Sequence, residues 1–246
     1  MPRTVLRLTG SDRVAFLQNL VTNDVTGVDH GLVYAAILTP QGKYLADFFL
    51  APDRDAILMD VDSTIAPGLV QRLNMYRLRS DVQIDATDIT PSRGIGPVVD
   101  GAFADPRHPD MGWRSYDGRP SQEVDWDAPR VAHVIPASGI ELGPDTYILE
   151  AGFERLNGVD FRKGCYVGQE VTARMKHKTE LRKGLVQVTV NGSAPVGSEI
   201  TLDGKSVGTL FTQSGTHAIA YLRFDRAGPD MEAAGVRVSW SGDAPS

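Results

Sequence analysis

The sequence predicts an α+β protein that ends in a small domain made of strands. Helical patterns and strand-like runs follow one another without the repeated strand–helix–strand order of a parallel sheet. From Lys183 onward the pattern changes to short strand-like runs separated by turn dipeptides such as Asp203-Gly204. These observations predict an α+β region over 1–182 and a small barrel or sandwich over 183–246.

The first ninety residues predict helices beside antiparallel strands. A strand at 5–8 precedes a helix, because the apolar residues after Ser11 recur every three or four positions, and Ser11 is the expected N-cap of that helix. Two strand-like runs flank residues 39–42, whose Pro and Gly suit a type I turn and predict a hairpin. A further strand leads into a second helix capped by Asp62 or Ser63.

The stretch from 91 to 130 is rich in Gly, Pro, Asp and Arg, which predicts a long surface connection. A structureless stretch of this length is unusual in a compact domain, so it is either functional or contains strand that the pattern conceals. We place an internal boundary near residue 90, which divides 1–182 into two intertwined subdomains. Further helices are expected near 130–135 and from Leu149.

Composition restricts the classes of function. The hydrophobic content of 41% is ordinary for a globular protein, and no window approaches the roughly 20 apolar residues of a membrane helix. The start of the chain lacks a secretory pattern, so we expect a cytoplasmic protein without a membrane partner. Cys165 is the single cysteine, which excludes an intramolecular disulfide and a cysteine metal cluster, and we expect no metal site. The net charge of −6 disfavours a protein that coats nucleic acid.

Positive charge is concentrated around Cys165. Seven cations occur close together in this part of the chain: Arg162, Lys163, Arg174, Lys176, Lys178, Arg182 and Lys183. Neighbouring cations and a helix N-terminus favour the reactive thiolate of a cysteine, which makes Cys165 a candidate catalytic residue. Two alternatives stay open, because a lone cysteine is often a small buried hydrophobic residue and a charge run is often a solvated face.

The segment KGCYVGQE at 163–170 resembles the K-G-C-[FY]-x-G-Q-E signature of YgfZ-type folate-binding proteins. These proteins belong to the superfamily of the glycine-cleavage T-protein, an aminomethyltransferase, and are related to mitochondrial iron–sulfur assembly factors. The likeness continues in LTGSDRVAFLQNLVTNDV, YAAILTPQGKYLADFFL and YILEAGFERLNGVDF and covers most of 5–185. It implies a ring of subdomains around a central folate channel, followed by a small C-terminal β-barrel, with Lys163 a second catalytic candidate.

The resemblance also implies where tetrahydrofolate, or a derivative, binds. Glu150 takes the place of the T-protein glutamate that holds the pteridine, and a carboxylate can accept parallel hydrogen bonds from the 2-amino group and the adjacent ring NH. Asp62 aligns with an asparagine near the ligand, and Arg174 and Lys178 are preferred for the glutamate tail. The motif residues assigned to the same site are Gly168, Gln169 and Glu170. The plain alternatives are a helix-start acid at Glu150 and a helix cap at Asp62.

One position departs from the T-protein pattern. T-proteins carry paired aspartates on the strand after the hairpin turn, whereas this sequence has Ala46-Asp47. Asp47 is therefore either a residue that contacts a folate nitrogen or an acid at the end of a surface-facing strand. Because half of the pair is missing, the sequence favours a folate-binding partner protein over an aminomethyltransferase.

Three functions compete. The first is a tetrahydrofolate-binding accessory protein for assembly or maintenance of iron–sulfur enzymes, including tRNA-modifying ones, in which Cys165 meets the client or assembly protein. Since such clusters need about four protein ligands, one cysteine could only share a cluster. The alternative is a folate-dependent one-carbon transferase in which Asp47 acts on the folate nitrogen. The third is an RNA-binding module that uses the basic run with Tyr166 and His177 as stacking groups.

Overall fold

The computed structural model describes residues 2–178 and 181–242, and the side chain of Lys178 lies outside this description. The described chain forms two compact units. Unit 1 holds the residues up to Val124 together with Leu156–Ala173, and unit 2 holds Asp125–Arg155 together with the residues from Arg174 onward. Within the described ranges, no helix is long and apolar enough to cross a bilayer.

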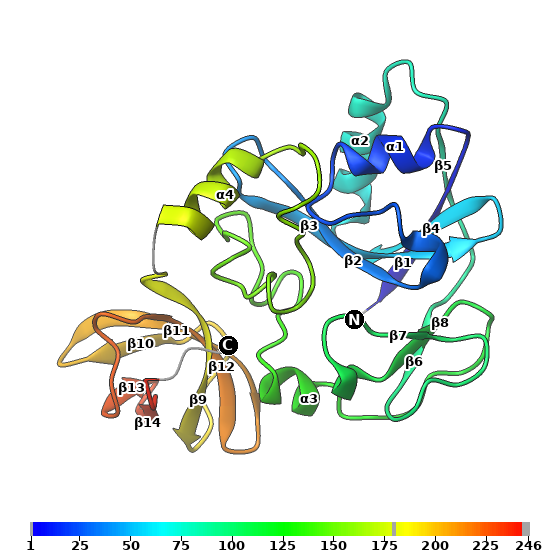
Figure 1. Ribbon diagram of the computed structural model, residues 1–246. Helices are drawn as coiled ribbons and strands as arrows, with labels where there is room; N and C mark the ends of the chain where they lie inside the picture. Colours follow the sequence, from blue (N-terminus) through cyan, green and yellow to red (C-terminus); the bar gives the residue numbers. More distant parts are fainter. Residues whose placement is uncertain (1, 179–180, 243–246) are drawn as a thin grey trace. The chain divides into compact units, whose positions relative to one another are not determined.

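An antiparallel five-stranded sheet forms the centre of unit 1 (Figure 1). Its spatial order is β2-β3-β4-β1-β5, and the strands are β1 (Arg3–Thr9), β2 (Val33–Leu38), β3 (Tyr44–Asp53), β4 (Ala56–Asp62) and β5 (Gln83–Ala86). The predicted hairpin is confirmed, because β2 pairs with β3 and the Gly42 amide donates to the Thr39 carbonyl at 2.9 Å.

One face of this sheet carries the hydrophobic core of unit 1. The helices α1 (Arg13–Gln18) and α2 (Ala66–Arg77) supply Leu17 and Leu73, which pack against strand residues such as Phe48. The short 3-10 helix η1 (Val28–His30) adds Val28 to the same cluster. Every second residue of the central strands is therefore apolar and faces the helices.

Both predicted helix caps in unit 1 are wrong. Asp62 is the last residue of β4, and its Oδ1 accepts the Thr64 amide at 2.8 Å in a turn that precedes α2. Ile65 occupies the N-cap position of α2 and makes no side-chain capping bond. The Ser11 hydroxyl donates to Asp81 at 2.9 Å, so it does not cap α1. In both places a tertiary or turn partner competes with the helix for the polar side chain.

The stretch from 91 to 130 is more ordered than the sequence predicts. It contains a three-stranded sheet of order β6-β8-β7, and these strands are β6 (Ser92–Gly94), β7 (Phe103–Ala104) and β8 (Trp113–Ser115). A 3-10 helix, η2 (Pro109–Met111), lies between β7 and β8. The strands are two or three residues long, so they show no alternation that a sequence pattern could reveal.

This segment supplies charged side chains to the second face of the large sheet. Asp60 of β4 has no exposed side-chain surface and receives Arg3 Nε at 2.6 Å, Arg114 Nη1 at 3.0 Å and the Tyr116 hydroxyl at 3.2 Å. Burial raises the pKa of Tyr116, and the Asp60 charge raises it further, so the phenol stays protonated and donates.

The ring of Phe49 lies beneath three guanidinium groups. Arg114 lies 4.0 Å from the ring centroid, Arg107 lies 4.7 Å away and Arg3 lies 5.8 Å away. Arg107 also binds Asp105 through Nη2 at 2.8 Å. Burial alone would raise the pKa of Asp105, but Arg107 and Arg114 hold it below its usual range. We call Arg3, Phe49, Asp60, Asp105, Arg107, Arg114 and Tyr116 the arginine cluster.

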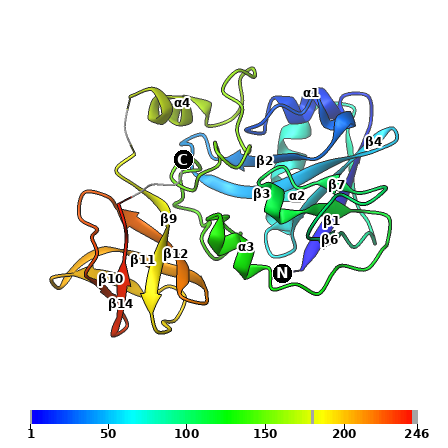
Figure 2. The same ribbon diagram turned by 60° about the horizontal axis from the view of Figure 1, so that its bottom comes forward.

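Unit 2 contains the closed barrel that the sequence predicts from Lys183 onward (Figure 2). Its six strands follow the order β10-β11-β12-β9-β14-β13. They are β9 (Lys183–Asn191), β10 (Glu199–Leu202), β11 (Lys205–Ser214), β12 (His217–Arg223), β13 (Met231–Ala233) and β14 (Val236–Ser239). Five strand-like runs are evident in the sequence, and β13 is the strand that they miss because it has three residues.

The rest of unit 2 consists of a short helix and turns. The helix α3 (Asp127–Ala132) lies close to the predicted helix, and its Arg130 donates to Glu141 at 2.7 Å. Glu141 also accepts the Thr212 hydroxyl, which ties this segment to β11. The helix predicted from Leu149 is wrong, because the backbone there forms turns and Gly152 has φ +77°. The alternative interpretation of Glu150 as an acid at the start of that helix is therefore also wrong.

We predict that Asp60→Asn lowers the free energy of unfolding by about 3 to 5 kcal/mol, because it removes the buried carboxylate that Arg3 and Arg114 share and leaves Arg114 only Asp105, at 3.4 Å. The matched control is Asp53→Asn. Asp53 pairs with Arg7 at 2.9 Å, but both side chains are more than 30% exposed, so the loss should stay below about 1 kcal/mol. Urea denaturation measures both, and equal losses would contradict a special role of the arginine cluster.

Candidate functional site

Lys163 anchors the start of the KGCYVGQE segment to the end of α1. Its buried ammonium donates to the carbonyls of Gln18 at 2.8 Å and Asn23 at 2.9 Å, and also to that of Val21. Carbonyls at a helix C-terminus lack intrahelical partners and carry partial negative charge, so a cation is favoured there. Burial lowers the pKa of Lys163 to about 8. All three donors of the ammonium therefore have structural acceptors, while a catalytic role of Lys163 stays a prediction.

Gly168 anchors the other end of the segment. Its φ of +85° lies in the left-handed region, and a Cβ at this position would lie 2.6 Å from the Thr39 carbonyl oxygen. The hairpin turn makes the reciprocal approach, because a Cβ on Gly42 would lie 2.9 Å from Val171. The two glycines thus let the start of helix α4 (Gln169–Lys178) pack against the β2–β3 turn.

Cys165 lies between these two anchors and is exposed. The alternative of a small buried cysteine is therefore wrong. The next residue, Tyr166, is buried, and its ring centroid lies 5.3 Å from Lys163 Nζ. The side chain of Arg162 is 95% exposed. The segment consequently exposes the single thiol of the sequence to solvent. Lys163 before it is held by hydrogen bonds, and Tyr166 and Gly168 after it are held by packing.

Asp47 is buried in unit 1 and does not lie at the surface. Its Oδ1 accepts the Tyr44 hydroxyl at 2.6 Å, and its Oδ2 accepts the Tyr34 hydroxyl at 3.0 Å. Burial and the Asp47 charge raise the pKa of Tyr34 well above its usual value, so this phenol remains a donor. The interpretation of Asp47 as an acid on a surface-facing strand is wrong, because its face of the sheet is covered.

The other predicted folate residues differ in exposure and in unit. Asp62 is buried, Gln169 is half-buried, and Glu170 and Arg174 are exposed. Arg174 and Glu150 belong to unit 2, whereas Asp47, Asp62, Gly168, Gln169 and Glu170 belong to unit 1. The side chain of Lys178 lies outside the described residues.

Unit 2 by itself contains a pocket at Glu150. Its volume is about 320 Å³, and its walls include apolar Met175 and Leu181 and the cations Arg182, Lys183 and Arg223. Asp225 completes the lining and lies 3.6 Å from Arg223.

Glu150 is positioned by its backbone as well as by its side chain. The Leu185 amide of β9 donates to the Glu150 carbonyl at 2.8 Å, and Gly184 allows this approach because a Cβ there would lie 2.9 Å from the same oxygen. The side chain receives the Tyr221 hydroxyl at 2.6 Å and lies 3.8 Å from Lys183 Nζ. Glu150 therefore stands at the pocket wall with acceptor capacity to spare.

Folate binding stays a prediction, and the chemistry of this lining suits such a ligand. A carboxylate can accept from the pteridine edge, apolar walls suit the ring, and cations suit the anionic tail. The sequence suggested Glu150 as a candidate, which stays a prediction, and gave no sign of its neighbours Tyr221 and Arg223. Tyr221 lies 71 positions from Glu150, so only the register of the barrel could have revealed the pair.

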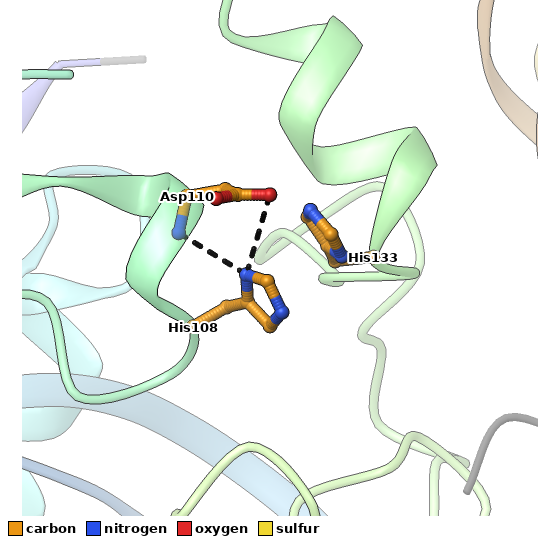
Figure 3. A group of neighbouring side chains, drawn as sticks. All are labelled: His108, Asp110 and His133. Carbon is orange, nitrogen blue, oxygen red and sulfur yellow. Dashed lines mark hydrogen bonds and ion pairs between the residues drawn. The ribbon is translucent and has the colours of Figure 1, made fainter. Parts of the chain in front are cut away.

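His108 and Asp110 form a local contact in unit 1 (Figure 3). His108 Nδ1 accepts the Asp110 amide at 3.2 Å and lies 3.9 Å from the Asp110 carboxylate. This bond caps η2. The third labelled residue, His133, belongs to unit 2. The capping bond accounts for the arrangement of the first two side chains without a ligand.

Comparison with known proteins agrees with this architecture. Residues 182–244 match the family described as CAF17, C-terminal beta-barrel domain. The iron–sulfur cluster assembly factor IBA57 homolog, mitochondrial, of Mycosarcoma maydis is 30% identical over 240 residues, which cover 80% of this chain and 58% of that protein. The human protein named iron–sulfur cluster assembly factor IBA57, mitochondrial, is 29% identical over 267 residues, which cover 89% of this chain and 75% of that protein.

A solved structure shows the same fold. The glycine cleavage system aminomethyltransferase T of Bartonella henselae superposes with a TM-score of 0.74 at 14% identity, over 96% of this chain and 82% of that chain. The predicted α+β, T-protein-like fold with a C-terminal barrel is confirmed. The predicted likeness to iron–sulfur assembly factors agrees with the names of these similar proteins, whereas the assignments to the T-protein superfamily and to the YgfZ type stay predictions.

We predict that Lys163→Met lowers the free energy of unfolding by about 2 kcal/mol, because the Gln18 carbonyl at the end of α1 and the Asn23 carbonyl in the loop after it lose a charged donor. The control is Lys176→Met, which removes an exposed ion pair with Glu154 and should change stability by less than about 1 kcal/mol. Urea denaturation at pH 7 compares the two variants. A Lys163→Met protein as stable as the control would show that the anchor is dispensable.

Proposed function

We propose that this protein is an accessory factor for the assembly or maintenance of iron–sulfur enzymes, that it binds tetrahydrofolate, and that Cys165 meets its client or assembly partner. The observation that carries this proposal is the exposure of Cys165 between two anchored neighbours. A buried thiol could not reach a partner protein, whereas this one needs no rearrangement of the fold. The names of the similar proteins, which are iron–sulfur cluster assembly factors, point to the same role.

The cluster is a cargo in this proposal. One thiolate supplies one of the roughly four protein ligands that an iron–sulfur cluster needs, so the partner must supply the others. Cys165 is the only cysteine of the sequence, so this chain offers no second thiolate. The thiolate of Cys165 would therefore act as a transient ligand during transfer or repair. We extend the proposal to tRNA-modifying clients and to a cytoplasmic location, although the names of the relatives include the word mitochondrial.

Tetrahydrofolate belongs in the unit 2 pocket in this proposal. Glu150 would accept from the 2-amino group and the adjacent ring NH, and the pocket cations would face the carboxylates of the tail. The bound folate would supply a carrier for a one-carbon group. Arg182, Lys183 and Arg223 line this pocket, so they join Arg174 and Lys178 as candidates for the tail.

The position of Asp47 supports an accessory role over an aminomethyltransferase. A general base must reach the proton that it removes from its substrate. Both carboxylate oxygens of Asp47 already accept buried tyrosine hydroxyls, at 2.6 and 3.0 Å. Such a carboxylate is held as part of the interior of unit 1. The transferase hypothesis needs Asp47 as its base, but the Asp47 carboxylate is already bound by two tyrosine hydroxyls in the interior.

We predict that Cys165→Ala abolishes the cellular function while leaving the fold intact. In cells that lack the native gene, this variant should restore less than a tenth of the iron–sulfur enzyme activity that the unchanged protein restores under oxidative stress. Glu199→Gln, an exposed change on β10, should restore full activity. Cellular iron–sulfur enzyme activity and thermal denaturation would be measured for both. Full activity of Cys165→Ala would refute the proposed role of the thiol.

We predict that Glu150→Gln weakens tetrahydrofolate binding at least tenfold in calorimetry, because an amide offers one acceptor oxygen where the carboxylate offers two. Glu154→Gln is the matched control, since Glu154 is exposed and pairs with Lys176 outside the pocket lining. Unchanged affinity in Glu150→Gln would show that folate binds elsewhere. The absence of binding to the unchanged protein would remove folate from the proposal and leave the thiol role standing.

A further inference from the structure

Two strands of the barrel present their outer faces to Glu150. In the β9–β12 pair, Leu185 lies opposite Tyr221 and Lys183 lies opposite Arg223. The alternate residues of the same strands, such as Val186 and Ala220, point into the barrel core. Because side chains alternate along a strand, the four opposed residues share the outer face. This face forms one wall of the pocket, since Lys183 and Arg223 line it.

The outer face binds Glu150 at both its backbone and its carboxylate. The Leu185 amide fixes the Glu150 carbonyl at 2.8 Å, and the Tyr221 hydroxyl donates to Oε2 at 2.6 Å. Lys183 Nζ lies 3.8 Å from Oε1 and 5.5 Å from the centroid of the Tyr221 ring. The Glu150 side chain is 8% exposed, whereas that of Lys183 is 46% exposed. The tyrosine is thus the closer partner, and the lysine is partly screened by solvent.

The Tyr221 hydroxyl stays protonated and therefore remains a hydrogen-bond donor to Glu150. Burial raises its pKa, and the hydrogen bond to Glu150 raises it further. A phenol that donates to a carboxylate at 2.6 Å forms a charge-assisted bond, which is among the stronger hydrogen bonds of proteins. A glutamate side chain has three rotatable bonds, and such a bond to one oxygen removes most of that freedom before a ligand arrives.

We propose that Tyr221 is a positioning residue that orients the Glu150 carboxylate for the 2-amino-4-oxopyrimidine edge of a reduced pterin. The inference rests on the proposed folate site. Recognition of this edge requires two acceptor oxygens in one plane with two N–H donors about 2.8 Å away. Tyr221 occupies one of the lone-pair directions of Oε2 and fixes that plane, so the remaining directions of the carboxylate are available to the ligand.

The proposal predicts a loss of selectivity as well as a loss of affinity. An analogue of tetrahydrofolate without the 2-amino group cannot use both carboxylate oxygens, so its affinity should depend little on how the carboxylate is oriented. Tyr221→Phe keeps the ring and removes the hydroxyl. We expect its Kd for tetrahydrofolate to rise at least tenfold, while its Kd for the 2-desamino analogue changes less than twofold. The preference for tetrahydrofolate should therefore fall at least about fivefold.

The experiment is calorimetry of the full chain with both ligands. The matched control is Thr189→Val, which removes an exposed hydroxyl from β9 and should preserve both Kd values. Thermal denaturation checks that each variant is folded. If Tyr221→Phe keeps the preference of the unchanged protein, or weakens both ligands equally, the positioning role is refuted and the folate site stands. If the unchanged protein binds neither ligand, the folate part of the proposed function fails, and this inference fails with it.

Discussion

The packing of three arginines around the ring of Phe49 is the constraint on which the rest of unit 1 depends. These side chains come from β1, from the segment between β7 and β8 and from β8 itself, and Asp60 and Asp105 balance them within the interior. A buried guanidinium is costly unless it is paired and hydrogen-bonded, so the part of this segment that belongs to unit 1, residues 91–124, must fold against the sheet. The second face of the sheet, which includes Asp47, is closed as a result.

A fixed sheet in turn gives the KGCYVGQE segment two firm supports. Gly168 packs against the β2–β3 turn, and Lys163 binds the carbonyls at the end of α1, which itself packs on the sheet. The motif therefore combines two tasks in eight residues. Gly168 and Lys163 serve the fold, and the Cys165 side chain between them is left exposed.

Unit 2 uses its barrel in a similar way. The interior of the barrel is apolar and supplies stability, while the outer face of β9 and β12 carries the groups that hold Glu150. The two faces of one strand pair thus separate the packing of the barrel core from the contacts with Glu150. A substitution such as Tyr221→Phe consequently changes the outer face and leaves the apolar core as it is.

Much of this protein is determined by local sequence. Alternation and turn residues predicted the β2–β3 hairpin and five of the six barrel strands, and the KGCYVGQE segment predicted the T-protein-like fold. The sequence did not reveal that Asp47 is buried or that Tyr221 contacts Glu150. It also predicted a helix from Leu149 where the backbone forms turns. Each of these depends on partners far along the chain, since burial and hydrogen bonding are set by tertiary packing and strand register. The sequence by itself therefore determined which residue types were available for the core and the candidate site. Only the tertiary structure determined which of these residues contact one another.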